Sequence, residues 1–139
     1  MATRRDAREW TVQFLFQVDF NDEDLDIALA DFWLSKEDLD EQTKEFAEAL
    51  IRGVIENRTS VDEAIAKYTD NWKVDRMGAV DRNVMRMAMY ELMYCEEIPQ
   101  VVTINEAVDI AKYFCSRQSG RFVNGILDRA SNDMEGTAR

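Results

Sequence analysis

The chain has 139 residues, of which 46% are hydrophobic, and it carries a formal net charge of −11 with no histidine. This length and hydrophobic fraction suit one compact domain with an apolar core, and they exclude an intrinsically disordered chain. No apolar run approaches the roughly 20 residues that cross a bilayer, and the N-terminus lacks the apolar stretch of a signal peptide, so a cytoplasmic protein without a membrane span is expected.

Apolar residues recur at helical spacing along nearly the whole chain, which predicts an all-α protein with seven helices. The apolar stretches that mark these helices are 7–18, 25–32, 46–55, 64–68, 77–92, 107–114 and 122–130. Thr3 can cap the first helix, and capping boxes at 60–63 and 103–106 open the fourth and the sixth. Pro99 ends the fifth helix, and Gly120 separates the last two.

A polar connection near residues 57–60 divides the expected helices into three and four. This division predicts a single domain over residues 1–139, built from an N-terminal helical bundle at 1–58 and a C-terminal helical bundle at 59–139 that pack together. No internal repeat or low-complexity segment interrupts this organisation.

The acidic excess is concentrated in one part of the chain. Residues 19–63 hold fifteen acidic and four basic side chains, so this segment carries the whole net charge of −11. The remaining residues hold equal numbers of acids and bases. Because exposed charges are screened beyond about 8 Å at physiological salt, the acidic segment does not prevent a basic patch elsewhere from binding a nucleic acid.

Three arginines lie at the start of the first helix, at positions 4, 5 and 8. Because a helix turns about every 3.6 residues, Arg4 and Arg8 lie on one face with Arg5 beside them. Guanidinium groups bind phosphates through paired hydrogen bonds, which makes the cluster a candidate RNA contact. The alternative is a solvated helix end whose arginines pair with Asp6 and Glu9. Positive charges at a helix N-terminus oppose the macrodipole, which favours a functional reason for them.

A second basic group lies near the last helix. Its cations, amides and aromatic ring are Lys112, Arg117, Arg121, Arg129, Gln118, Asn124 and Phe122. Such a mixture suits single-stranded RNA, whose unstacked bases lie on aromatic rings and offer their edges to polar side chains. The alternative is that Phe122 belongs to the core and that the charges are only solvated.

Catalysis and metal binding find no support in the residue types. Without histidine the chain lacks the commonest general base and the commonest metal ligand. Cys95 and Cys115 lack the spacing of a metal site, so they are expected to be reduced thiols. Carboxylate pairs such as Asp75 with Asp81 are expected by chance in an acidic chain. The sequence therefore predicts no enzyme, no cofactor and no metal site.

Four blocks of sequence together resemble the NusB family. The first is the arginine cluster followed by QFLFQ at 13–17, and the second is VDRNVMRMAMYEL at 80–92. The third joins the dipeptide IP at 98–99 to TINEAVDIAK at 103–112, and the fourth is FVNGILD at 122–128. These blocks stand in the order and at the spacing of the family, and they span nearly the whole chain.

The resemblance implies an all-α fold of two three-helix bundles and the role of a transcription antitermination factor. Such a protein pairs with NusE, a small-subunit ribosomal protein, on boxA RNA and joins a transcribing RNA polymerase, notably in ribosomal RNA operons. The RNA-binding residues that the resemblance implies are Arg4, Arg5, Arg8, Lys112, Gln118, Arg121 and Phe122. The NusE contact maps near Asp75 and Asp81, whose carboxylates can meet basic groups of the partner.

The chain departs from the family pattern at a few positions. Asp6 interrupts the arginine cluster, Gln118 stands where an acid is often found, and segment 19–63 matches little beyond Gly53. Two other functions stay open. One is an acidic helical adaptor that binds only proteins. The other is an RNA-binding domain of the kind fused to ribosomal RNA methyltransferases, which the lack of a catalytic segment before Arg139 disfavours.

Overall fold

The structure is a computed structural model that describes residues 2–37, 39–69 and 77–137, with only the backbone described at 136 and 137. The described residues form seven α-helices and no strand, which confirms the predicted all-α fold for this part of the chain. The helices are α1 (Arg4–Phe20), α2 (Leu25–Leu34), α3 (Glu41–Glu56), α4 (Arg58–Tyr68), α5 (Ala79–Tyr94), α6 (Gln100–Phe114) and α7 (Arg117–Thr137). Across the described ranges, no helix is both long and apolar enough to span a bilayer.

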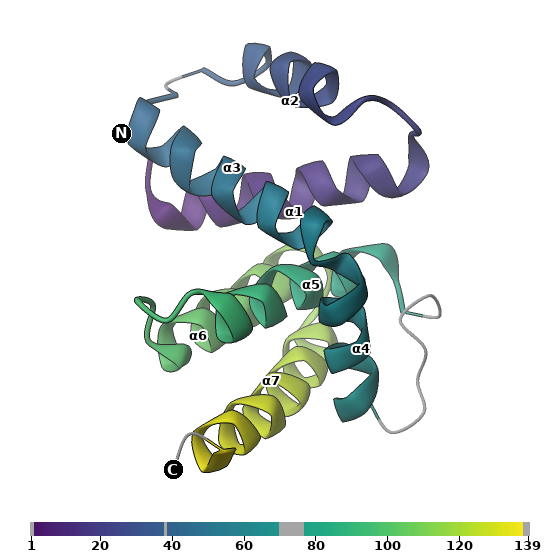
Figure 1. Ribbon diagram of the computed structural model, residues 1–139, viewed down its shortest axis with the longest axis vertical. Helices are drawn as coiled ribbons and strands as arrows, with labels where there is room; N and C mark the ends of the chain where they lie inside the picture. The colour runs from purple at the N-terminus through teal and green to yellow at the C-terminus, as the bar shows by residue number, and fades with distance from the viewer. Residues whose placement is uncertain (1, 38, 70–76, 138–139) are drawn as a thin grey trace.

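The helices form two groups that meet where α1 packs on α5 (Figure 1). α2 lies at the top of the view, above α1 and α3, whereas α4, α5, α6 and α7 lie below α1. α6 packs along α7, and α3 contacts α5 as well as α1. Because α1 and α3 contact helices of both groups, the division into two three-helix bundles with a border near residue 58 stays a prediction.

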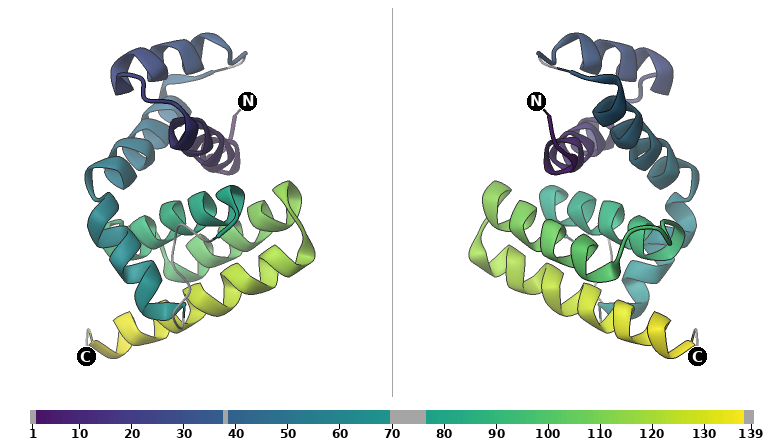
Figure 2. Two further views of the ribbon diagram at one scale, coloured as in Figure 1. Left: turned by 90° about the vertical axis from the view of Figure 1, so that its right-hand side faces the viewer. Right: turned by 90° about the vertical axis from the view of Figure 1, so that its left-hand side faces the viewer.

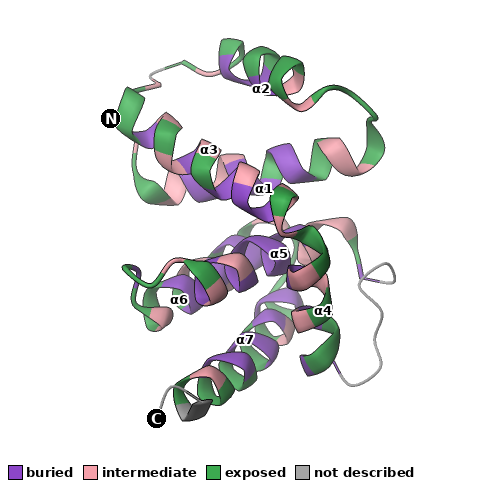
Figure 3. Ribbon diagram, in the orientation of Figure 1, coloured by how far each residue is buried: buried purple, intermediate pink, exposed green. Residues whose placement is uncertain are grey.

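Two clusters of buried side chains hold the helices together, and their positions are visible as buried stretches in Figure 3. The smaller cluster lies between α1, α2 and α3, where the rings of Phe14 and Phe32 meet edge to face with centroids 5.4 Å apart. The larger cluster joins α1 and α3 to α4, α5, α6 and α7. Every residue from 83 to 89 is buried, so α5 is the central helix of this larger core.

Helix α1 is buried on two faces. The apolar stripe predicted for this helix consists of Ala7, Trp10, Phe14 and Val18, which recur at helical spacing. Ala7 and Phe14 pack in the smaller cluster, whereas Val12 and Leu15, outside the stripe, pack in the larger one. The apolar pattern predicts this helix correctly but accounts for only one of its faces. The second face is buried because tertiary packing places α1 between α3 and α5.

The two predicted capping boxes are wrong. α4 begins at Arg58, so Ser60 lies inside its first turn, where its hydroxyl donates to the carbonyl oxygen of Asn57 at 3.0 Å. α6 begins directly after Pro99, and Thr103 lies buried one turn inside that helix. A serine or threonine followed by glutamate three residues later marks a cap only where the backbone leaves the helix, and the residue pattern does not report the backbone angles.

Gly120 does not separate α6 from α7, contrary to the prediction. The break lies at Cys115 and Ser116, and the Ser116 hydroxyl accepts a hydrogen bond from the backbone N–H of Ser119 at 3.1 Å, as a helix cap does. Gly120 instead permits a close approach between two helices. A Cβ atom at this position would stand 2.6 Å from Cγ of Lys112, so the absence of a side chain lets the lysine stem lie across α7.

Gly53 lets α3 approach α5 in a similar way. A Cβ atom at this position would stand 2.1 Å from the ring of Tyr90, so a side chain here would overlap a residue of the central helix. This contact gives a physical reason for glycine at the position of segment 19–63 that matches the family pattern.

Candidate nucleic-acid interface

The first turn of α1 is capped by its own side chains. The Thr3 hydroxyl accepts from the backbone N–H of Asp6 at 3.2 Å, and the Asp6 carboxylate accepts from the backbone N–H of Thr3 at 2.8 Å. This reciprocal pair is a capping box, which confirms the predicted cap at Thr3. Asp6 therefore fixes the start of the helix, and Arg5 and Arg8 find their carboxylate partners on α5 and α6 instead.

Arg8 lies inside the protein, where it forms a two-pronged ion pair with Glu91 of α5. Nε and Nη2 of Arg8 donate to the two carboxylate oxygens at 2.8 and 2.9 Å, and the two side chains are 2% and 1% exposed. Thr103 donates to the same carboxylate at 2.8 Å, and Glu106 accepts from Arg8 at 3.3 Å. So buried a guanidinium offers no surface to a phosphate, so the structure does not support the implied role of Arg8 as a direct RNA contact.

Arg4 and Arg5 are the members of the cluster that reach the surface. Arg4 is exposed, with its guanidinium 4.5 Å from the centre of the Phe46 ring. The Arg5 side chain is 37% exposed and donates to Glu106 at 2.9 Å and to Asp109 at 3.0 Å. The hydrogen bond to Glu106 is the main cause that raises the pKa of Arg5. The Arg5 guanidinium remains partly open to an anionic ligand where α1 meets α6, whereas Arg4 is open on the side where α1 meets the start of α3.

The second predicted basic group lies mostly at the corner between α6 and α7, but Arg129 lies farther along α7, where it donates to the carbonyl oxygen of Tyr68 at 3.0 Å. Lys112, Gln118 and Arg121 are exposed there. Phe122 is half-buried and packs against the larger core cluster. Both interpretations of this group therefore hold in part, because its polar members are open to solvent and its ring belongs largely to the core.

Contacts between α1, α6 and α7 bring the two groups onto one side of the molecule. Arg5 bonds to Asp109, which lies one turn before Lys112 on α6. The stem of Lys112 covers Gly120, next to Arg121 on α7. In both views of Figure 2 the N-terminus and the α6–α7 corner lie toward the same edge, whereas α3 and α4 lie toward the opposite edge. We call four cations at the start of α1 and at this corner the basic edge: Arg4, Arg5, Lys112 and Arg121. Arg4 lies on the α3 side of α1, over the ring of Phe46.

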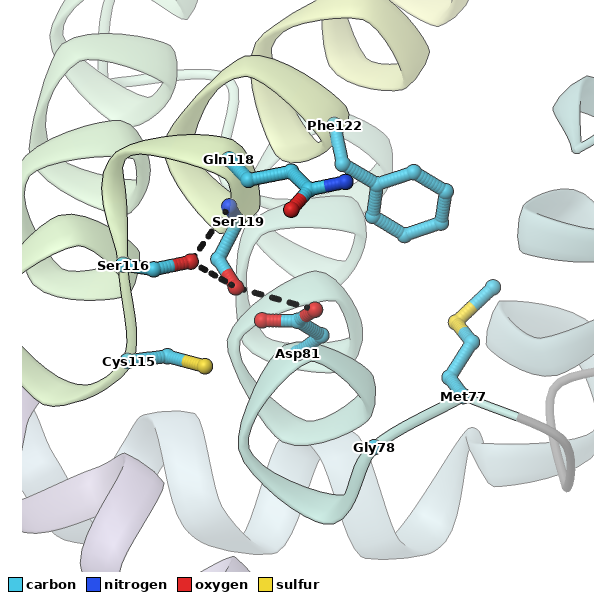
Figure 4. Close-up of a pocket in the computed structure, with 8 residues that line it drawn as sticks. All are labelled: Met77, Gly78, Asp81, Cys115, Ser116, Gln118, Ser119 and Phe122. Carbon is cyan, nitrogen blue, oxygen red and sulfur yellow. Dashed lines mark hydrogen bonds between the residues drawn. The ribbon is translucent and has the colours of Figure 1, made fainter.

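A cavity of about 420 Å³ lies where the start of α5 meets the α6–α7 corner (Figure 4). Its lining residues are Met77, Gly78, Asp81, Cys115, Ser116, Gln118, Ser119 and Phe122. Ser119 donates to one carboxylate oxygen of Asp81 at 3.2 Å, and the other oxygen is buried without a hydrogen-bond partner among the described residues. The cavity thus joins Asp81, predicted for a protein partner, to Gln118 and Phe122, predicted for RNA. Asp75 lies outside the described residues.

Two exposed phenylalanines of α1 were given no functional role by the sequence pattern, although Phe16 belongs to the QFLFQ block. Phe16 is 39% and Phe20 is 67% exposed, and their ring centroids are 5.1 Å apart. Phe16 lines a second cavity of about 470 Å³ together with Val80, the neighbour of Asp81 on α5. Both rings lie outside the apolar stripe of α1, so only their unexpected exposure marks them as a candidate contact surface.

A second buried ion network joins the end of α1 to α4 and α5. Asp19 accepts hydrogen bonds from Arg82 at 2.9 Å, from Asn83 at 2.8 Å and from Arg86 at 3.1 Å. Arg86 also donates to Asp62 at 2.9 Å. The side chains of Asp19 and Arg86 are each 6% exposed. The signal that could have found this network is an arginine within the most apolar helix, because a buried charge requires a partner.

We expect Asp19 to make the fold sensitive to acid. Burial alone would raise the pKa of Asp19, but the hydrogen bonds from Asn83 and Arg82 and the charge of Arg86 outweigh it and hold the pKa below its usual value. A carboxylate with a lowered folded-state pKa stabilises the fold above its unfolded pKa of about 4, and this contribution is lost as the pH falls through the folded-state pKa.

Asp19→Asn should therefore be less stable than the parent at neutral pH, and the difference should narrow as the pH falls below about 4. Urea unfolding at a series of pH values measures both quantities. Asp31→Asn, at an exposed position of α2, removes the same charge and serves as the control. A constant difference between Asp19→Asn and the parent across this pH range would show that the ionisation of Asp19 does not stabilise the fold.

The seven helices of the described residues place this chain in the class of small all-helical proteins. A family model described as the NusB family matches residues 5–132. The transcription antitermination protein NusB of Anaeromyxobacter dehalogenans (strain 2CP-1 / ATCC BAA-258) is 44% identical over 135 residues, which cover 96% of this chain and 94% of that relative. The chain belongs to the NusB family, which confirms the recognition from its four sequence blocks.

Solved structures agree with this membership. NusB of T. maritima superimposes with a TM-score of 0.86 at 43% sequence identity, covering 94% of this chain and 92% of that one. A complex of the antitermination factors NusB and NusE with double-stranded RNA contains a chain with a TM-score of 0.85 at 24% identity, covering 94% of this chain and 96% of that one. The second likeness establishes the shared fold. The family consists of transcription antitermination factors, not enzymes.

Proposed function

We propose that this protein is an RNA-binding transcription antitermination factor that pairs with a NusE-type small-subunit ribosomal protein on boxA-type single-stranded RNA. It acts in the cytoplasm and supports processive transcription of ribosomal RNA operons, and it reaches the RNA polymerase elongation complex indirectly through the assembled complex. The observation that carries the proposal is the basic edge, on which Arg4, Arg5, Lys112 and Arg121 gather from three helices of a chain whose net charge is −11.

The basic edge has the composition of an RNA contact. Guanidinium and ammonium groups bind phosphates, and the exposed amide of Gln118 beside them can read a base edge. Segment 19–63, which holds the acidic excess, lies mainly on α2 and α3, and α3 lies toward the edge opposite to the α6–α7 corner (Figure 2). Screening over about 8 Å at physiological salt weakens the effect of distant acids on the basic edge. Asp40 and Glu45 are near neighbours of it, because they line the same cavity as Arg4.

A protein partner would bind beside the RNA, at the start of α5 and the end of α1. Asp81 supplies a carboxylate there, and Phe16 and Phe20 supply exposed rings nearby. An acidic group beside apolar rings suits a basic partner, because the rings provide buried contact area and the charge orients the approach. The complex of NusB and NusE with RNA, whose NusB-like chain shares this fold, supports the pairing. Asp75 belongs to the same proposed contact on the basis of the family resemblance.

We expect a NusE-type partner to increase the affinity of this chain for boxA-type RNA, because the pair presents a longer basic surface than the chain alone. Fluorescence anisotropy of labelled RNA, titrated with the chain and with an equimolar mixture of the chain and the NusE-type partner, measures this increase.

Asp81→Lys should weaken partner binding in a calorimetric titration by about ten-fold or more, while RNA binding by the isolated chain changes little. Asp81→Asn, which keeps an acceptor for Ser119, separates loss of charge from reversal of charge.

The alternative function is an acidic helical adaptor that binds proteins without binding RNA, and the acidity of segment 19–63 favours it. The same titrations distinguish the two functions. If the chain bound the NusE-type protein but the mixture had no more affinity for boxA-type RNA than the partner alone, the adaptor would replace the proposed function. An unrelated RNA of equal length shows whether the binding depends on sequence.

A further inference from the structure

Tyr113, near the end of α6, is 77% exposed and is the most exposed aromatic side chain among the described residues. Its ring is supported by Phe114, with centroids 5.3 Å apart and an angle of 59° between the ring planes. Phe114 in turn packs against the larger core cluster. The tyrosine ring therefore lies at the surface, with a neighbour anchored in the core beside it.

The position of Tyr113 extends the basic edge along α6. Glu106, Asp109 and Tyr113 follow one another at intervals of three and four residues, so they lie along one side of this helix. Arg5 contacts both carboxylates. Tyr113 thus lies one helical turn beyond the carboxylate that binds Arg5.

Cations follow Tyr113 along the chain, and the nearest acid before it, Asp109, is paired with Arg5. Residues 110–121 contain three cations and no acid, and the cations are Lys112, Arg117 and Arg121. All three are exposed. An exposed aromatic ring with exposed cations close to it in the chain is typical of surfaces that bind single-stranded nucleic acids, where bases stack on rings and cations bind the backbone.

We propose that Tyr113 is a base-stacking platform of the RNA-binding surface, on which one unstacked base of a single-stranded RNA lies while Lys112 and Arg117 bind the flanking phosphates. This inference rests on the proposed function and extends it to a particular side chain. Phe122 is the ring that the sequence pattern predicts for this role. It is half-buried against the core, so it offers a base less of its surface than Tyr113 does.

Tyr113→Ala tests the platform, with Tyr113→Phe as the matched variant that keeps the ring. The alanine variant should bind boxA-type RNA about ten-fold more weakly, and the phenylalanine variant should bind within about two-fold of the parent. The slope of log K against log salt should stay unchanged in Tyr113→Ala, because no charge is removed. Lys112→Ala should reduce that slope by about 0.7, the contribution of one phosphate contact on a single strand. Urea unfolding confirms that both variants at this exposed position are folded.

A set of RNAs, each with one abasic nucleotide, identifies the stacked base. At that nucleotide the losses of affinity from base removal and from Tyr113→Ala should not add, because both changes remove the same contact. Additive losses at every nucleotide would overturn the platform. So would a Tyr113→Phe variant as weak as Tyr113→Ala, because the hydroxyl and not the ring would then be the contact.

The failure of this inference is distinguishable from the failure of the proposed function. If Tyr113→Ala binds RNA like the parent while variants of the basic edge lose affinity, the platform is overturned and RNA binding stands. If Tyr113→Ala weakens binding to the NusE-type protein but not to RNA, the ring is a protein contact and the platform is again overturned. If the parent binds no RNA with or without the partner, both proposals fail together.

Discussion

Arg8→Ala should lower the free energy of unfolding by about 3–5 kcal/mol, a large part of the roughly 5–15 kcal/mol that stabilises a typical domain. The variant removes one member of a buried ion pair and leaves the carboxylate of Glu91, which is 1% exposed, without its opposite charge. Thr103 continues to donate one hydrogen bond to Glu91, but a neutral hydroxyl does not neutralise a buried carboxylate. Urea unfolding followed by circular dichroism at neutral pH measures the change.

Arg4→Ala is the matched control for this experiment. Arg4 lies one turn earlier on the same helix and is exposed, so its replacement should change the stability by no more than about 0.5 kcal/mol. The double variant Arg8→Met with Glu91→Leu should recover much of the loss, because an apolar pair removes both charges from the interior. If Arg8→Ala unfolded at the same urea concentration as the parent, the buried pair would not stabilise the protein in solution.

The burial of Arg8 also changes how RNA-binding data should be interpreted. Arg8 links α1 to α5 through Glu91 and to α6 through Glu106. A loss of RNA affinity in Arg8→Ala would therefore follow from displacement of α1, which carries Arg4 and Arg5. Variants of the exposed arginines test the RNA contact more directly.

Replacing the four cations of the basic edge with glutamine should lower the affinity for boxA-type RNA by about 100-fold or more, because each charge-assisted hydrogen bond contributes roughly 1.5–3 kcal/mol. The slope of log K against log salt should move from about −3 toward zero, since each phosphate contact on a single strand contributes about 0.7 to it. Anisotropy titrations at several salt concentrations provide both values. The variant carries changes at Arg4, Arg5, Lys112 and Arg121.

A variant with four acids replaced by their amides controls for net charge. The positions are Asp22, Glu23, Asp31 and Glu56, all exposed and all within segment 19–63. Because these acids lie on α2, on α3 or between α1 and α2, the salt slope should change little. If the two variants changed the slope equally in opposite directions, net charge and not the basic edge would control RNA binding. A parent that showed no salt dependence would also exclude an electrostatic RNA contact.

The sequence by itself predicted the features that depend on neighbouring residues along the chain. Helical periodicity predicted the all-α fold and the seven helices, and Thr3 with Asp6 forms the cap at the start of α1. The prediction failed where the same local sequence pattern is compatible with two different backbone structures. Ser60 and Thr103 have the pattern of a cap but lie inside helices, and Gly120 has the pattern of a break but lies where the stem of a lysine crosses α7.

Only the tertiary structure decided which charges and rings lie at the surface. Arg5 and Arg8 are three residues apart on one helix, yet one is partly exposed and the other is buried against Glu91, 83 residues further along the chain. Helical spacing contains no information about which distant carboxylate will face an arginine. The same holds for Phe122 and Tyr113, because a ring is buried or exposed according to the helices that pack against it, and these come from other parts of the sequence.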